Sequence, residues 1–128
     1  MKRLLITLLL AVLSTSAMAE WLNLTPSGDR AHYINMATIR KQGNIVKIWE
    51  MLDYKSPQKG PDGAPFLSIK TLVAYDCVNV TIAFPDFTYF SGNMGGGKRI
   101  SNSQYSGGWR DIDPDSMMIV VWRQLCNK

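Results

Sequence analysis

The ten residues IVKIWEMLDY (45–54) carry the clearest secondary-structure signal in the chain. Successive side chains of a β-strand point to opposite faces, so residues 45, 47, 49, 51 and 53 share one face and the residues between them share the other. Large apolar side chains occur on both faces. This pattern predicts a central strand that lies between a core and either a helix or a partner surface.

Short strand-like segments separated by turns extend outward from this stretch. Residues 21–24 and 31–36 precede it, and residues 66–75, 77–84 and 88–90 follow it. Residues 66–75 and 77–84 form either a hairpin or one long strand bent by a bulge. Residues 56–65 hold three prolines and two glycines and predict a loop, as does the polar stretch 101–108. We also expect one helical turn at residues 38–41, a turn at residues 42–44 and a break at Pro85-Asp86.

The C-terminal segment is the best helix candidate. Asp113 can cap it, Pro114 suits its first position, and Asp115 places a negative charge at the positive end of the helix dipole. Residues 118, 121, 122 and 125 have the spacing that buries one helix face on a sheet. A buried strand at residues 117–122 is the alternative, because several of these residues are β-branched.

The N-terminus has the pattern of a secretory signal peptide. Lys2 and Arg3 precede an apolar run at residues 4–13, and Ala17-Met18-Ala19 matches the small-x-small pattern at which signal peptidase cuts. The apolar run is too short for a membrane-spanning helix, which needs about 20 residues. We therefore expect residues 1–19 to be removed and residues 20–128 to form one domain in the periplasm or outside the cell. No cysteine stands at or just after the expected cut, so we expect no lipid anchor.

Charge excludes one class of function. Removal of Lys2 and Arg3 lowers the number of basic residues from 14 to 12, against 10 acidic residues. The remaining charges are scattered and form no basic cluster of the kind that nucleic-acid-binding proteins present. We expect no nucleic-acid partner and no membrane span after signal cleavage.

Cys77 and Cys126 are the only cysteines. Both follow the signal sequence, and the oxidising conditions outside the cytoplasm allow them to pair. Two free thiols are the alternative. Together with His32, the only histidine, they cannot supply the four ligands of a structural zinc site unless carboxylates join them.

Two motifs resemble functional loops, and both are incomplete. The run GNMGGGKR (92–99) approaches a phosphate-binding loop, but Arg99 replaces the hydroxyl residue that would hold Mg²⁺, so we expect a flexible glycine turn instead. The run DIDPD (111–115) lacks the glycine and the glutamate of a calcium loop, which leaves a weak surface cation site as an alternative to a helix start. No nucleophile motif accompanies His32. We expect no catalytic residue, no cofactor and no metal.

The aromatic residues give the best indication of a binding surface. Trp49 and Trp122 are predicted core residues. Other aromatic residues lie in turn-rich sequence near cations, where interface anchors concentrate. The predicted partner-binding residues are Tyr89, Phe90, Lys98, Arg99, Tyr105 and Trp109.

The order of several short motifs resembles the bacterial surface-adhesin protein E family. The matching segments are YIN (33–35), TIRK (38–41) before a glycine, IW (48–49), LDY (52–54), SIK (68–70), DC (76–77), the glycine-rich stretch to Lys98, Trp109 with Ile112 and Pro114, and Cys126. This resemblance implies an α+β fold: a single antiparallel β-sheet of about five to seven strands with a C-terminal helix packed on it, closed by a bridge between Cys77 and Cys126. It also implies adhesion to host extracellular-matrix or serum proteins.

The sequence thus predicts an exported, non-enzymatic binding module. Its partner is expected to be another protein, with host matrix proteins as candidates, bound through an exposed sheet face or the loops at residues 55–65 and 86–109. An envelope enzyme or a periplasmic small-ligand carrier is the alternative. A deep pocket that contains His32 or paired acids would favour the alternative, whereas a flat aromatic and basic surface would favour protein recognition.

Signal cleavage can be checked by mass spectrometry of the protein isolated from the cell envelope. We expect Glu20 as the first residue and no added lipid, because Ala17 and Ala19 place the cut there and no cysteine stands at or just after it. Detection of an intact Met1, or of an acylated N-terminus, would contradict this expectation.

Overall fold

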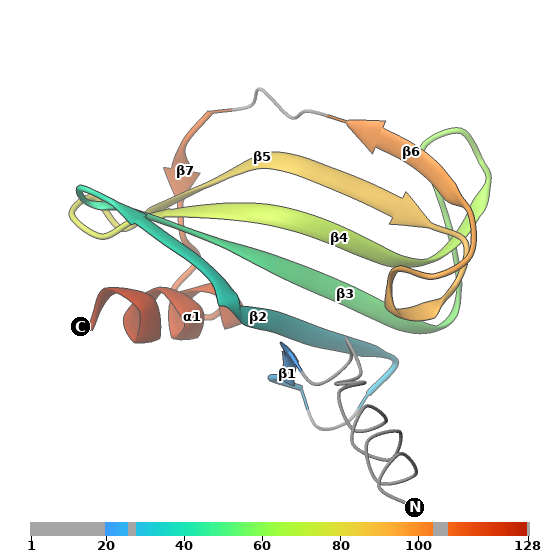
Figure 1. Cartoon of the computed structure of the whole chain (residues 1–128), viewed down its shortest axis with the longest axis horizontal. Helices are drawn as coiled ribbons and strands as arrows, with labels where there is room; N and C mark the ends of the chain where they lie inside the picture. The colour runs from blue at the N-terminus through green and yellow to red at the C-terminus, as the bar shows by residue number, and fades with distance from the viewer. Residues whose placement is uncertain (1–19, 26–27, 104–107, 128) are drawn as a thin grey trace, which may run out of the picture.

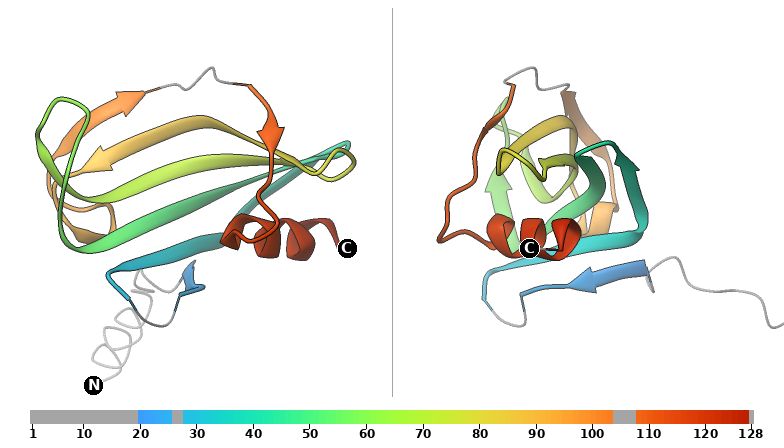
Figure 2. Two further views of the ribbon diagram at one scale, coloured as in Figure 1. Left: turned by 180° about the vertical axis from the view of Figure 1, so that it is seen from behind. Right: turned by 90° about the vertical axis from the view of Figure 1, so that its left-hand side faces the viewer.

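A computed structural model describes residues 20–25, 28–103 and 108–127 of the chain. These residues form one antiparallel sheet in the order β1-β2-β3-β4-β5-β6, and a seventh strand, β7, pairs with β5 (Figure 1). The strands are β1 Trp21–Asn23, β2 Arg30–Gln42, β3 Ile45–Lys59, β4 Pro65–Asp76, β5 Thr81–Phe90, β6 Arg99–Ser103 and β7 Arg110–Asp111. The helix α1 Met117–Cys126 packs against one end of the sheet (Figure 2). The predicted α+β fold is confirmed.

The strand from which the sequence analysis started is central, as predicted. β3 lies between β2 and β4, and its residues Val46 and Ile48 belong to the hydrophobic core together with Val73 and Tyr75 of β4. The helix supplies Ile119, Val121, Trp122 and Leu125 to this core, which identifies residues 117–122 as helix rather than strand. Trp122 is a core residue as predicted. Trp49 is not, because it lies half-buried on the opposite face with the ammonium group of Lys70 5.0 Å from its ring centroid.

Strand bulges explain the errors in the predicted strand boundaries. The expected helical turn at residues 38–41 is part of β2, at a register shift between Asn35 and Arg40. There the hydroxyl of Thr38 donates to the carbonyl oxygen of Asn35 and accepts the backbone N–H of Trp49. A side chain thus makes the hydrogen bond that a regular strand would make with its backbone.

The sequence predicted a break at Pro85 and a loop that includes Pro57, and both predictions are wrong because each proline lies in a strand at a bulge. β5 runs without a break through Pro85, because Phe84 and Pro85 together stand opposite Val73 in a bulge that needs no N–H from the proline. β3 extends to Lys59 and includes Pro57, again at a register shift, so the loop expected at residues 56–65 shortens to residues 60–64.

The turn between β4 and β5 is a hairpin turn at residues 77–80. One carboxylate oxygen of Asp76 accepts the backbone N–H groups of Val78 and Asn79, and the other accepts the side-chain amide of Asn79. These hydrogen bonds, with those from Asn79 the larger, hold the pKa of the Asp76 carboxyl below its usual range.

The helix begins later than the sequence predicted. Its N-cap is Ser116 and its first residue is Met117, whereas Asp113 and Pro114 belong to the preceding turn. The Asp113 side chain accepts the N–H of Asp115, and its backbone oxygen accepts the N–H of Ser116. Because Asp113 closes this turn, it does not cap the helix. No helix within the described part of the chain is long and apolar enough to span a membrane.

β1 covers only residues 33–35 of β2, so the remainder of β2 forms an edge of the sheet. On this edge the guanidinium of Arg40 donates to the backbone carbonyl oxygens of Ile39, at 2.8 Å, and Ala37, at 3.5 Å. Arg40 thereby occupies two acceptors of the edge strand.

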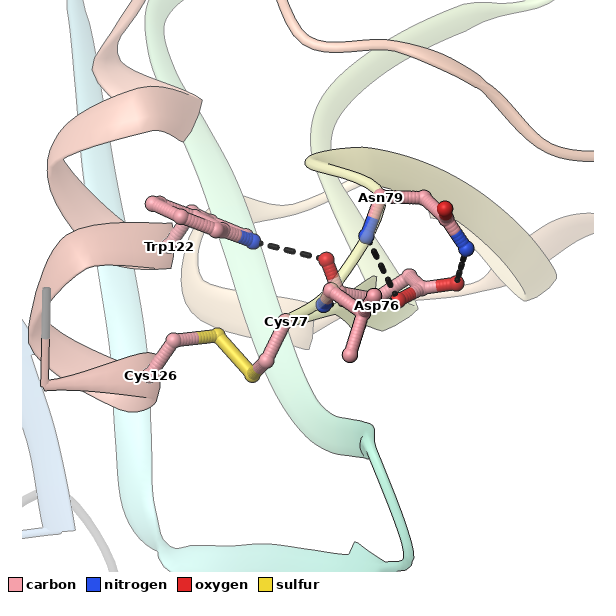
Figure 3. Close-up of a disulfide and its surroundings, with 6 residues drawn as sticks. Asp76, Cys77, Asn79, Trp122 and Cys126 are labelled. Carbon is pink, nitrogen blue, oxygen red and sulfur yellow. Dashed lines mark hydrogen bonds between the residues drawn. A yellow bond between two sulfur atoms is a disulfide. The ribbon is translucent and has the colours of Figure 1, made fainter.

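A disulfide joins the end of α1 to the turn after β4 (Figure 3). Cys77 and Cys126 are bridged with a Cα–Cα distance of 5.4 Å, across a sequence separation of 49 residues. Beside the bridge, the indole N–H of Trp122 donates to the backbone oxygen of Asp76 at 2.8 Å. The predicted pairing is confirmed.

Removal of the bridge should destabilise the domain strongly. Replacing Cys77 and Cys126 together by Ser should lower the free energy of unfolding by about 2–5 kcal/mol, because the unfolded chain gains the entropy of an open loop. Urea unfolding of the domain with and without reductant measures this: reductant should bring the parent down to the level of the double variant and leave the variant unchanged. Two titratable thiols in the native parent would contradict the bridge.

Candidate functional site

Two of the predicted partner-binding residues, Tyr89 and Phe90, are the last residues of β5. Tyr89 lies on the helix side of β5, where its ring contacts those of Phe66 and Phe87 at centroid distances of 4.8 and 5.7 Å. Phe90, the next residue, stands opposite Arg99 of β6. Tyr105 lies outside the described residues.

Three of the predicted residues are exposed along the outer edge of β5. β6 pairs with one end of this edge and β7 with the other. Lys98 and Arg99 are exposed at the start of β6, and Trp109, which is 48% exposed, precedes β7. We call Lys98, Arg99 and Trp109 the outer-edge surface.

The glycine-rich loop before β6 is held by side chains of the sheet. Asp53 accepts hydrogen bonds from the side chain of Asn93 and the N–H of Met94, and Ser68 donates to the oxygen of Gly92 and accepts the N–H of Gly95. Asp53 and Ser68 are cross-strand neighbours. The expectation of a flexible turn missed this cross-strand support.

The same loop does not form a phosphate cradle. The backbone N–H groups of residues 92, 94, 95, 96 and 98 all donate to protein oxygens, so they are not directed toward a common ligand. Gly97 has φ +70°, and a Cβ there would lie 2.8 Å from the Gly92 nitrogen, so the glycine serves a close approach of backbone to backbone.

A concave surface occupies the part of the sheet that α1 leaves uncovered. On the helix side of β4, Val73 and Tyr75 are completely buried, whereas Ile69 and Thr71 are only half-buried. The reason is length: a strand of twelve residues spans about 40 Å, and a helix of ten residues spans about 15 Å.

We call this concavity the aromatic groove. Its volume is about 450 Å³, and it is lined by Ile69, Thr71, Phe84, Phe87, Tyr89 and Arg110. Arg110 is the only charged residue in this lining, and its guanidinium lies over the Phe84 ring at 4.7 Å from the centroid. Beyond Arg110 and Phe84 an adjoining hollow includes Asp111 and Asp113.

A small recess continues from the groove toward α1. It has a volume of about 80 Å³, shares Thr71 and Phe84 with the groove, and is also lined by His32, Glu50 and Met118. This recess contains the histidine and an acid, the feature that the sequence analysis associated with a small-ligand carrier or an enzyme.

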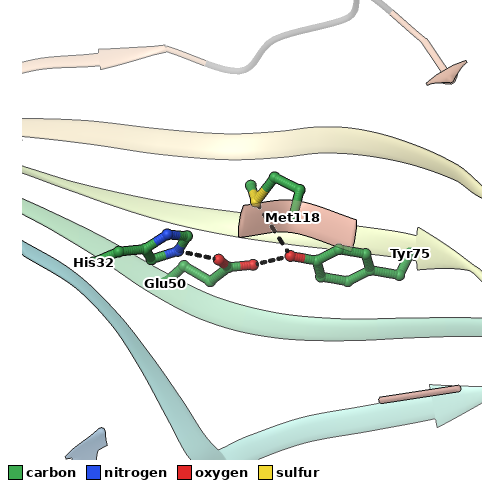
Figure 4. Close-up of polar contacts among 4 residues, drawn as sticks. All are labelled: His32, Glu50, Tyr75 and Met118. Atoms are coloured by element: carbon green, nitrogen blue, oxygen red, sulfur yellow. Dashed lines mark hydrogen bonds and ion pairs between the residues drawn. The ribbon is translucent and has the colours of Figure 1, made fainter. Parts of the chain in front are cut away.

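His32, Glu50 and Tyr75 form a buried hydrogen-bonded row at the recess (Figure 4). His32 Nε2 lies 2.5 Å from Oε1 of Glu50, and the Tyr75 hydroxyl donates to Oε2 of the same carboxylate at 2.5 Å. The Tyr75 hydroxyl also lies 3.5 Å from Met118 Sδ. Glu50 is 3% exposed and Tyr75 is completely buried. Burial, together with the Glu50 charge and hydrogen bond, raises the pKa of the Tyr75 phenol far above its usual value.

Of the residues that line the groove and the recess, the sequence singled out Tyr89 as a binding residue and His32 as a marker of a pocket. Glu50 gave a usable signal, because it shares a strand face with Ile48 and Leu52, where a carboxylate needs partners. Phe87 belongs to the aromatic run 87–90, but Arg110 gave no signal, because its approach to these aromatic residues depends on β7 pairing with β5. Within the described residues no three His, Cys, Asp or Glu side chains are placed to hold a metal ion.

Comparison with known proteins gives a family and a fold. The family model for surface-adhesin protein E matches residues 21–127. The crystal structure of protein E from non-typeable Haemophilus influenzae superposes with a TM-score of 0.67 at 14% identity, covering 88% of this chain and 79% of that chain. A second crystal form of H. influenzae protein E gives a TM-score of 0.64 at 15% identity, covering 88% and 91%. No curated protein sequence matches the chain significantly.

The buried row should make stability depend on pH in the alkaline range. Because the folded state raises the Tyr75 pKa, folding retains a proton that the unfolded chain releases above about pH 10. The associated stability is present below pH 10 and is lost as pH rises, at about 1.4 kcal/mol per pH unit.

Tyr75→Phe tests this dependence. At pH 7 the variant should be less stable by about 1–3 kcal/mol, because the buried Glu50 carboxylate loses a donor. Above pH 10 it should lose stability less steeply than the parent, and the two unfolding energies should converge. Parallel pH dependences in urea unfolding would contradict the role assigned to Tyr75.

Proposed function

The chain belongs to the surface-adhesin protein E family, and on that premise we propose that it is an exported, non-enzymatic binding module that recognises a protein partner. Host extracellular-matrix and serum proteins are the candidate partners. The signal-like residues 1–19 support export, with the mature protein in the periplasm or outside the cell. The family is one of surface adhesins, which supports binding rather than catalysis.

The exposed indole of Trp109 carries the proposal of protein recognition. A tryptophan in this chain can be buried on the sheet, as Trp122 is, but Trp109 is 48% exposed. Tryptophan and arginine are the residues most often found as energetic anchors of protein interfaces. Lys98 and Arg99 lie along the same outer edge of β5, and neither makes an ion pair within 4.0 Å among the described residues.

Alanine substitution on the outer-edge surface tests the proposal. Trp109→Ala should weaken binding to a responsive member of a panel of immobilised matrix and serum proteins by about 2 kcal/mol or more, and Lys98→Ala with Arg99→Ala should weaken it mainly at low salt. Both variants should melt as the parent does. Leu22→Ala is the control, because Leu22 is an apolar residue that is 53% exposed on β1, at the opposite edge of the sheet.

Two results would contradict the proposal. Loss of folding in Trp109→Ala would show that the indole has a structural role. Unchanged affinity in all outer-edge variants would place the recognition surface elsewhere.

A further inference from the structure

We propose that the aromatic groove is a binding site for a small amphipathic carboxylate, a molecule with an apolar chain and a single carboxylate head. The apolar chain of the ligand would lie on Ile69, Phe87 and Tyr89, and its carboxylate would bind the guanidinium of Arg110. This activity goes beyond protein recognition by the outer-edge surface and uses different residues.

The size of the groove fits a small molecule. Its volume of about 450 Å³ lies within the usual range for ligand sites, about 300–1,000 Å³. The recess of about 80 Å³ adjoins it through Thr71 and Phe84 and offers room at one end. A stable protein interface needs about 800 Å² from each partner, and a hollow with six lining residues supplies only part of such an area.

The chemistry of the floor calls for an apolar occupant. Ile69 and Thr71 alternate on β4, and Phe87 and Tyr89 stand directly opposite them on β5. A sheet face open to water usually carries polar side chains at such positions. Here three of the four are apolar or aromatic and only half-buried, so a bound chain would remove their remaining surface from water.

The charge of the lining selects the head group. Arg110 is exposed, its guanidinium is oriented by the Phe84 ring, and it makes no ion pair within 4.0 Å among the described residues. A planar guanidinium binds a carboxylate through two parallel hydrogen bonds. Asp111 and Asp113 lie in the adjoining hollow and not in the groove lining. The positive charge of Arg110 is therefore uncompensated by a lining acid only on the side that faces the groove.

Titration calorimetry with dodecanoate, below its micelle concentration, tests the site in the folded domain. We expect saturable binding of one molecule, at least about tenfold tighter than binding of dodecan-1-ol, which has the same chain without the charge. Dodecyltrimethylammonium, with the opposite charge, should bind no tighter than the alcohol.

Variants distinguish the contribution of the ligand's carboxylate to the affinity from that of its apolar chain. Arg110→Gln should abolish the preference for dodecanoate over the alcohol and leave alcohol binding unchanged, and Arg110→Lys should retain part of it. Phe87→Ala should weaken both ligands. Arg123→Gln is the matched control, because Arg123 is an exposed cation on α1 outside the groove, and it should bind as the parent does.

Several results would overturn the proposal: no saturable binding, equal affinity for the acid and the alcohol, an unaffected Arg110→Gln, or an equal loss in Arg123→Gln. Loss of dodecanoate binding in a folded Trp109→Ala with Arg110→Gln unaffected would also overturn it, since the ligand would then occupy the outer-edge surface. Melting curves of each variant show whether an effect comes from unfolding.

Discussion

The position of α1 on the sheet is the constraint on which the other features depend. Trp122 fixes it twice, by filling the core and by donating to the backbone of Asp76, and the bridge to Cys77 fixes its last turn. Both attachments lie at the β4–β5 turn, so the helix is held at one end of the sheet and is too short to reach the other. The aromatic groove exists because of this mismatch, and the recess at Met118 marks the helix end that bounds it.

The buried row of His32, Glu50 and Tyr75 lies where helix cover gives way to the open sheet. Placing a carboxylate in a core costs free energy unless partners satisfy it, and both oxygens of Glu50 have one. Tyr75 connects this polar row to the core below α1, and Met118 covers it from the helix. The domain therefore contains a polar boundary between its apolar core and its groove, a costlier solution than an apolar residue at position 50 would be.

Much of the architecture was predictable, because the alternation in residues 45–54 and the spacing in residues 118–125 reflect burial directly. The errors occurred where one side chain or one bulge overrides a local preference. Thr38 replaces a backbone partner, Pro85 lies where no N–H is required, and Asp113 closes a turn instead of capping the helix. The strand face of Glu50 showed that the carboxylate needs partners, but not which residues supply them, because these lie 18 and 25 positions away and meet it only through strand register.

Arg40 has a consequence for how copies of this chain behave when they meet. A bare strand edge offers its carbonyl oxygens to any passing extended segment, and sheets can then grow from molecule to molecule. Along β2, the oxygens of Ala37 and Ile39 already accept the guanidinium of Arg40, and the side chain adds a positive charge that repels an identical edge. One residue thus covers two of the acceptors through which the sheet could be extended by another molecule.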